Sequence, residues 1–143
     1  FLFRLYISTR EAELASFGWS EADKNAFLEL QFEAHQHHYA TISPAADQNV
    51  ILWEGRPVGS LIVIRGRKEI RLAEIVLLPE DRGRGIGSKL IEDLAEEAVV
   101  RGLPLRLHVA RFNRAIRLYR RLGFVLIRDT GTHFFMERSP ELL

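Results

Sequence analysis

Runs of apolar residues separated by turn-forming residues predict most of the elements of this chain. Short apolar runs indicate strands, and apolar residues three or four positions apart indicate helices that face a core. We expect helices over about 8–17, 20–39, 85–101 and 113–122, and a loop over 40–49 that is broken by Ser43-Pro44. We expect strands over Phe1–Ile7, Val50–Trp53, Val58–Ile64, Glu69–Leu78, Pro104–Val109, Phe124–Ile127 and Thr132–Glu137.

Helix start signals and apolar stripes refine this pattern. Ser8-Thr9-Arg10-Glu11 resembles a capping box, and Ser20 with Asp23 three residues later is a second helix start. Leu28 and Phe32 lie off the apolar stripe of the second helix, so we expect this helix also to line a pocket. The stripe itself consists of Ala26, Phe27, Leu30 and Ala34.

The order of these elements predicts a mixed sheet. A strand, a glycine turn, a helix and another strand follow one another near the middle, which implies one parallel pairing within a mostly antiparallel sheet. The 143 residues suit one domain over 1–143, and 47% apolar with 27% charged residues is the mixture of a soluble globular protein. The fold class is therefore α/β, with helices flanking the sheet.

Charge and cysteine content exclude several classes of function. The 20 basic and 19 acidic residues give a net charge of +1, which implies no overall preference for nucleic acid. There is no cysteine, so disulfides, cysteine nucleophiles and cysteine-bound metals are excluded, and we expect a cytoplasmic protein. No apolar run approaches the ~18 residues that would span a bilayer, and no signal-peptide pattern opens the chain.

A glycine-rich turn between a strand and a helix is the strongest functional signal. The apolar run that ends at Pro79 is followed by Arg82-Gly83-Arg84-Gly85-Ile86-Gly87 and then by a helical pattern. Glycines permit a tight turn and close approach of another molecule to the backbone. The first N–H groups of the helix lack partners within it and, with the helix dipole, form an anion site suited to phosphate.

The spacing of the glycines narrows the choice among phosphate-containing ligands. A dinucleotide loop would need a third glycine where Ser88 stands, and no lysine follows Gly87 as a nucleoside-triphosphate loop requires. What remains is R-x-x-G-x-G, at Arg82, Gly85 and Gly87. Here the sequence resembles the GNAT superfamily of acyl-CoA-dependent N-acyltransferases, whose signature is [Q/R]-x-x-G-x-[G/A] between a strand and a helix.

A second segment carries the same resemblance. Asn113-Arg114-Ala115-Ile116-Arg117-Leu118-Tyr119, followed by Leu122-Gly123-Phe124, is similar to the N-x-x-A-x-x-[L/F]-Y-x-x-x-G-F segment of GNAT proteins. It lies about thirty residues after the glycine turn, where the family has it. The order of the elements also matches a GNAT domain from end to end.

The resemblance implies a role for each matching residue. The backbone of Ile75, Val76 and Leu77 pairs with the pantetheine arm of acetyl-CoA, and main-chain N–H groups of Gly83 to Ser88 hold its pyrophosphate. Asn113 contacts the cofactor arm and can also cap its helix. Tyr119 donates a proton to the departing thiolate, and its alternative role is that of a core residue.

Two residues are candidates for the base that takes the proton of the attacking amine. His108 lies five residues before Asn113 and could accept a proton at neutral pH. Glu74 is the single acid beside an otherwise apolar strand and could act as a base or hold a cationic amine. The alternatives are a hydrogen-bonded histidine in a buried strand and a salt bridge at a strand end. The sequence does not choose between His108 and Glu74.

The sequence also contains a cluster of histidines and a cluster of arginines, and neither pattern predicts a metal site or a nucleic-acid site. His35, His37 and His38 share a predicted helix, and His35 and His38 share one face of it. No third ligand and no HExxH pattern accompany that pair, so we expect a solvated or substrate-facing cluster and no metal. Helical spacing should spread the six arginines of 106–121 over a solvated face, where one could meet the cofactor's 3′-phosphate. We therefore do not expect these arginines to bind nucleic acid.

The resemblance therefore implies an N-acetyltransferase that moves an acetyl group directly from acetyl-CoA to a primary amine. We expect a small-molecule amine as acceptor, with a protein or peptide N-terminus or lysine as the alternative. A non-catalytic acyl-CoA-binding module is the rival from another class. Family members are often dimers, so a homodimer is consistent with the resemblance.

Overall fold

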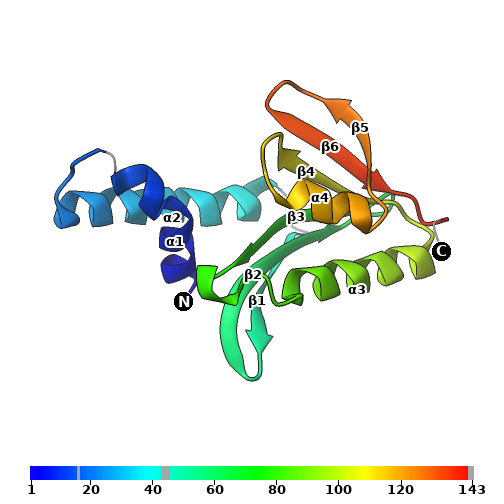
Figure 1. Ribbon diagram of the computed structural model, residues 1–143, viewed down its shortest axis with the longest axis horizontal. Coiled ribbons are helices and arrows are strands. Elements are labelled where there is room, and N and C mark those ends of the chain that lie inside the picture. The colour runs from blue at the N-terminus through cyan, green and yellow to red at the C-terminus, as the bar shows by residue number, and fades with distance from the viewer. Residues whose placement is uncertain (16, 43–45, 142–143) are drawn as a thin grey trace.

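The computed structural model describes residues 1–15, 17–42 and 46–141, which form a six-stranded sheet flanked by helices (Figure 1). The strands lie in the order β1-β2-β3-β4-β6-β5. They are β1 (Ala46–Trp53), β2 (Arg56–Arg65), β3 (Ile70–Leu77), β4 (Leu105–Ala110), β5 (Val125–Asp129) and β6 (His133–Arg138). The helices are α1 (Leu2–Ala15), α2 (Glu21–Ile42), α3 (Ile86–Arg101) and α4 (Ala115–Arg121), with a short 3₁₀ turn over Pro79–Asp81.

The predicted mixed sheet is confirmed. β3 and β4 are parallel, and the other four pairings are antiparallel. The parallel ladder is short, because it joins only 70–72 of β3 to 105–107 of β4. Beyond that point β3 remains paired with β2 as far as Leu77, whereas β4 continues along β6. The two central strands therefore separate in the second half of β3.

A β-bulge in β3 decides which residues face which side of the sheet. Val63 of β2 stands opposite Leu72, but the preceding residue, Ile62, stands opposite Glu74, so Ala73 is an extra residue. Leu72 and Ile75 consequently pack into the same core, although they are three positions apart. Glu74 faces the opposite side of the sheet.

The main core lies between the sheet and α3 with α4. Ile91, Leu94, Ala95 and Ala98 of α3 pack against the buried side chains of β3, β4 and β6, as the predicted helical pattern requires. α3 ends at Arg101, and the following C-cap, Gly102, adopts the left-handed conformation with φ 68°. The residues of this core belong to the segments that the sequence pattern predicted best.

The prediction of a first strand over Phe1–Ile7 is wrong, because all of this segment after Phe1 lies within helix α1. The aromatic rings of Phe3 and Tyr6 lie 5.3 and 5.7 Å from the ring of Phe32 on α2. Apolar residues at three- and four-residue spacing, Leu2, Leu5 and Tyr6, suit a helix once a second helix is present to cover them.

The predicted capping box at Ser8 is also wrong. The hydroxyl groups of Ser8 and Thr9 donate to the carbonyl groups of Leu5 and Tyr6, at 2.6 and 2.7 Å, as such residues do inside a helix. The second start signal is confirmed, because the N–H of Asp23 donates to Ser20 Oγ at 3.2 Å.

The predicted apolar stripe of α2 and the predicted loop after it require correction. Leu28 is buried and Phe32 partly buried, whereas Leu30 is 68% exposed, so the helix turns a different face to the protein. α2 continues to Ile42 and β1 already begins at Ala46, which leaves little of the predicted loop over 40–49. Its breaker, Ser43-Pro44, lies outside the described residues. Pairing with β2 extends β1 over polar residues that the apolar pattern could not reveal.

α1 and α2 lie together at one end of the molecule, where α2 projects well beyond the sheet (Figure 1). Together they cover the face of β2 and β3 that is opposite α3, because the side chains of Ser60, Glu74 and Val76 lie against α1 and α2. None of the helices within 1–15, 17–42 and 46–141 is long and apolar enough to cross a bilayer.

Candidate active site

The glycine turn, Arg82–Ser88, joins the 3₁₀ turn to α3, as its pattern predicted. Gly83 and Gly85 have φ angles of 76° and 82°, which side chains other than glycine rarely adopt. Gly85 is the N-cap of α3, and the first in-helix bond runs from Lys89 N–H to the Gly85 carbonyl at 3.1 Å. The N–H groups of 86–88 precede that bond, so they point out of the helix start, where an anion would bind.

An ion pair between the exposed Arg56 and the buried Asp81 holds the start of this turn in place. Asp81 is fully buried, and Arg56 at the start of β2 donates to both of its carboxylate oxygens, at 2.8 and 3.3 Å. The hydrogen bond from Arg56 lowers the pKa of Asp81. Arg82 donates through Nε to the carbonyl of Leu77 at 3.1 Å, which ties the turn to the end of β3. Arg82 therefore has a structural role in the protein itself.

The separation of β3 and β4 creates a cavity of about 190 Å³, the strand cavity. The three residues predicted for catalysis, Glu74, His108 and Tyr119, all line it, together with Asn113 and His133. They come from β3, β4 and α4, which approach one another only in the folded chain. The structure thus brings together the residues that the two sequence motifs proposed, although their roles stay predictions.

Tyr119 lies at the bottom of the strand cavity as part of the main core. It is 7% exposed, and its ring meets that of Phe124 edge-on at 5.7 Å. Burial raises the pKa of its phenol, so the group keeps its proton at neutral pH. Its two suggested roles, core residue and proton donor, are compatible in this position.

Asn113 sits at the start of α4, where its side chain accepts the N–H of Ala115 at 2.8 Å. This bond satisfies one donor of the helix start, as the alternative reading of Asn113 predicted. A contact with a cofactor arm remains a prediction.

His108 is exposed rather than buried, so the alternative reading of a histidine in a buried strand is wrong. Its ring rests against Phe135 of the neighbouring β6, with the ring centres 4.7 Å apart. The pKa of His108 is lowered first by partial desolvation of the imidazole and then by the charge of Arg71. Arg128 and His133 lower it further, while Glu69 opposes them.

Glu74 forms a hydrogen bond with His35 of α2, and sequence reasoning did not foresee this pair. His35 Nε2 and Glu74 Oε1 are 3.0 Å apart, and both side chains are largely buried, at 21% and 27% exposure. The hydrogen bond to Glu74 raises the pKa of His35. The alternative reading of Glu74 as a salt-bridge residue therefore holds whenever His35 is protonated.

A signal for this pair did exist in the sequence. Leu28, Phe32 and His35 recur at helical spacing, and they form the face that α2 turns toward the protein. If that face, rather than the stripe that contains Leu30, is taken as the buried one, the sequence predicts that His35 points inward.

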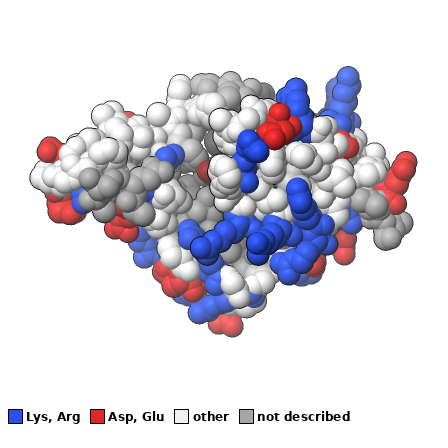
Figure 2. Space-filling model, turned by 45° about the horizontal axis from the view of Figure 1, so that its top comes forward, with Lys and Arg blue, Asp and Glu red and all other residues white. Residues whose placement is uncertain are grey.

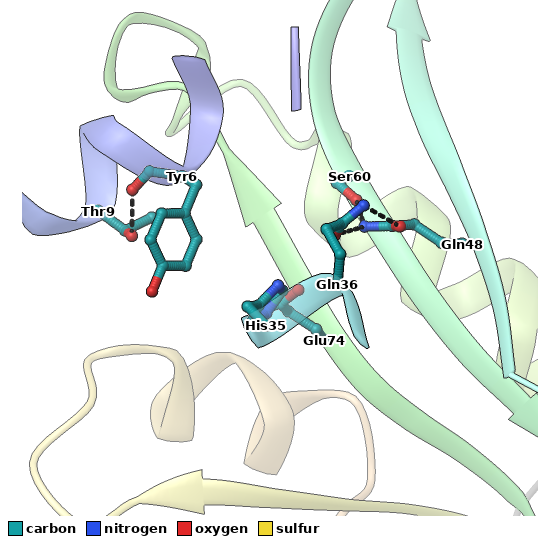
Figure 3. A network of polar contacts seen from close by, with 7 residues as sticks. All are labelled: Tyr6, Thr9, His35, Gln36, Gln48, Ser60 and Glu74. Carbon is teal, nitrogen blue, oxygen red and sulfur yellow. Dashed lines mark hydrogen bonds and ion pairs between the residues drawn. The ribbon is translucent and has the colours of Figure 1, made fainter. Parts of the chain in front are cut away.

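The pair lines a second cavity of about 280 Å³, the helix cavity, between α1, α2 and the sheet. Figure 3 shows Tyr6 of α1, His35 and Gln36 of α2, and Glu74 of β3 converging on it. Gln48 and Ser60 close its far side, because Gln48 exchanges hydrogen bonds with Gln36 and donates through Nε2 to Ser60 Oγ. Glu74 is a lining residue of both cavities, so it stands where the helix cavity meets the strand cavity.

Basic side chains gather on one face of the molecule (Figure 2). Of the six arginines in 106–121, four line a single groove with Asn113 and the exposed ring of Phe112, so they are less evenly spread than helical spacing suggested. They are Arg111, Arg114, Arg117 and Arg120. Within the described part of the chain, no group of three histidine or acidic side chains is placed to hold a metal ion.

Comparison with known proteins agrees with this geometry. The sequence profile described as "Acetyltransferase (GNAT) domain" matches residues 44–126, more than half of the 143-residue chain. The chain belongs to the GNAT acetyltransferase family. The resemblance read from the glycine turn and the Asn113–Phe124 segment is thereby confirmed.

Solved structures share the GNAT fold over most of the chain. The PaiA N-acetyltransferase of Thermoplasma acidophilum, in complex with coenzyme A, superposes with a TM-score of 0.69 at 19% identity and covers 96% of this chain and 90% of that one. The ribosomal-protein-S18-alanine N-acetyltransferase of Escherichia coli gives a TM-score of 0.63 at 22% identity, over 76% and 77% of the two chains. At these identities the likeness shows the fold alone.

A curated relative shares more sequence over a shorter stretch of this GNAT domain. Thialysine N-epsilon-acetyltransferase of Bos taurus is 48% identical over 71 residues, which cover 48% of this chain and 42% of that protein. The chain spans about half the length of the curated relatives it matches or less.

Proposed function

We propose that this GNAT chain transfers the acetyl group of acetyl-CoA to the primary amine of a small molecule. The observation that carries the proposal is the position of Glu74, which lines both the strand cavity and the helix cavity. An acyl donor in the first cavity and an amine in the second would meet beside this carboxylate. Holding two reactants in one orientation is itself a large part of catalysis.

The donor would be held by the glycine turn. The outward N–H groups at the start of α3 suit the pyrophosphate, and the open edge of β3 beyond Leu72 suits the pantetheine arm as an added strand. This open edge includes Ile75, Val76 and Leu77, the residues that the resemblance implied. The arginine groove beside Asn113 offers positive charge for a further phosphate.

The transfer consists of one bond formed and one bond broken. The amine nitrogen attacks the thioester carbonyl carbon, the carbon–nitrogen bond forms, and the carbon–sulfur bond breaks. The thiolate takes a proton from Tyr119, whose raised pKa keeps that proton available. The proton lost by the amine passes to Glu74 and its partner His35, directly or through water.

Direct transfer needs no acyl-enzyme, and the chain has no cysteine to form one. A small acceptor is favoured because the helix cavity measures only about 280 Å³. The name of the thialysine acetyltransferase relatives supports the same class of acceptor.

The test is release of thiol from acetyl-CoA when a series of small amines and short peptides is added. We expect turnover with small amines, and much weaker turnover with peptides of equal amine basicity. Tyr119→Phe should retain acetyl-CoA binding and lose most of the turnover. Tight binding of acetyl-CoA without thiol release from any amine or peptide would instead identify a binding module.

A further inference from the structure

Aromatic rings follow one another along the helix cavity from the place where the amine would lie. Among the described residues that line this cavity, the single carboxylate is Glu74, which pairs with His35. The ring of Tyr6 lies 5.3 Å from the ring of His35 (Figure 3). The ring of Phe32 lies 5.7 Å from that of Tyr6, and both rings are part of the lining. The part of an acceptor beyond its amine would therefore meet aromatic side chains.

Aliphatic side chains complete this part of the lining. They belong to Leu2 and Leu5 of α1 and to Val76 of β3, the next residue after Glu74 on the same side of the strand. The cavity volume of about 280 Å³ suits an acceptor with one ring. An aromatic ring placed here would bury apolar surface, and it would also gain from contacts with other rings.

The remaining amide and hydroxyl groups of the lining hydrogen-bond within the protein. Gln48 exchanges hydrogen bonds with Gln36 and donates to Ser60, and the Thr9 hydroxyl donates to the carbonyl of Tyr6. None of these groups carries a charge. A second ammonium group on the acceptor would thus lie beside apolar side chains, with no second carboxylate in the described lining, and such burial of a charge is costly.

The family does not determine this part of the site. The side chains that α1 and α2 contribute to the cavity all precede residue 44, where the match to the GNAT profile begins. The preference for an acceptor must therefore be read from the side chains of this chain.

We infer that the acceptor is a monoamine with an aromatic ring on a short aliphatic linker, and that this ring lies against Tyr6 and Phe32 while the amine lies at Glu74. The inference rests on the proposed function, since it names the substrate class of the same site. The two rings determine specificity and take no part in the proton transfers.

The test compares three primary amines of similar length: 3-phenylpropylamine, n-hexylamine and 1,5-diaminopentane. For the parent protein we expect kcat/KM for 3-phenylpropylamine to exceed that for hexylamine by about 3-fold or more, because of the ring contacts. It should exceed that for the diamine by about 10-fold or more, because of the second charge.

Phe32→Leu keeps an apolar side chain and removes the ring. It should lower kcat/KM for 3-phenylpropylamine by about 10-fold, mainly through KM, and change that for hexylamine little. Phe3→Leu is the matched control, because the ring of Phe3 also lies near that of Phe32, at 5.3 Å, but is not part of the lining. This control should leave the order of the three amines unchanged.

A second pair of variants tests the inference without altering the rings. Leu2→Glu places a carboxylate in the lining at the first residue of α1, where an acid suits the helix start. Compared with Leu2→Gln, it should raise kcat/KM for the diamine by about 10-fold. This pair serves if Phe32→Leu fails to fold.

The outcomes distinguish this inference from the proposed function. Turnover of the three amines without a preference for 3-phenylpropylamine, or an equal loss for all three in Phe32→Leu, would overturn the aromatic acceptor and keep the acetyltransferase. Absence of thiol release with every amine, while acetyl-CoA still binds, would overturn both.

Discussion

The two faces of the sheet build their parts of the active site in different ways. On the side of α3, the glycine turn presents backbone groups, and its conformation depends on Gly83, Gly85 and the ion pair of Arg56 with the buried Asp81. On the side of α1 and α2, the helix cavity is defined by side chains from two helices and three strands.

This difference determines what each part tolerates. A main-chain site is indifferent to most side chains but requires particular backbone angles, so few sequences can form it. A side-chain site can be changed residue by residue without disturbing the fold. The first suits a donor that the family shares, and the second suits an acceptor that differs among its members.

The largest expected effect is on the main-chain side. Gly87→Asp should weaken coenzyme A binding by about 100-fold or more, because it places a carboxylate at an anion site. A β-carbon at Gly87 would make only ordinary contacts, 3.9 Å from Ile75 Cδ1, so the variant should fold. Calorimetric titration with coenzyme A measures the effect.

Controls for this variant come from both faces. Gly87→Ala should bind coenzyme A more tightly than Gly87→Asp, and Glu74→Gln should bind it as the parent does. Equal affinity of Gly87→Asp and the parent would show that the glycine turn is not the phosphate site. Gly85→Asp should lose binding too, with added backbone strain at φ 82°.

The next effect concerns Tyr119, which belongs to the α3 side and faces the strand cavity. Tyr119→Phe keeps the ring contact with Phe124 and loses the proton donor. Its kcat should fall by about 100-fold with unchanged affinity for acetyl-CoA, a typical contribution of a general acid. Single-turnover measurement of thiol release checks this, and an unchanged chemical rate would remove Tyr119 from the mechanism.

The third prediction sets the two histidines of the two cavities against each other. The pKa of His35 lies above 6.5 and that of His108 below it, so the pH at which kcat/KM rises identifies the group. We expect a rise above pH 6.5, because His35 must lose its proton before the pair with Glu74 can accept one. Glu74→Gln should remove this limb, and His108→Ala should retain it.

The same profiles can contradict this assignment. A limb below pH 6.5 that disappears in His108→Ala would make His108 the base. Two amines of different basicity should be compared, since the less basic amine needs less help in losing its proton and should show a shallower limb.

The smallest effect is on stability. Because Glu74 raises the pKa of His35 in the folded protein, the pair stabilises the fold below pH 6.5, and this contribution is lost as pH rises through the raised pKa. His35→Asn should therefore lower the free energy of unfolding by about 1 kcal/mol more at pH 6 than at pH 9. Urea denaturation of His35→Asn beside His37→Asn, an exposed position of α2, measures the difference; equal loss at both pH values would contradict it.

The sequence predicted the α3 side better than the α1 side for a physical reason. Elements from Val58 to Arg138 are close to their predicted bounds, because local glycine and apolar patterns determine them. The first strand, the capping box at Ser8 and the stripe of α2 were wrong, because α1 and α2 owe their conformation and orientation to each other. Tyr119 was found through a motif, and Glu74 and His108 through their positions on strands beside the motifs, whereas the inward position of His35 depends on how the helices pack.

The extra residue in β3 determines which side chains in the second half of the strand face each side of the sheet. In an unbroken strand, Glu74 would share the side of Leu72, since residues two apart point the same way. It would then project a carboxylate into the apolar core beneath α3, where an unpaired charge is costly. Ala73 shifts the count by one and turns the acid toward His35 instead. Deleting Ala73 would therefore leave the inside and the outside of the strand's second half as they are, whereas pairing Ala73 as a regular residue would exchange them.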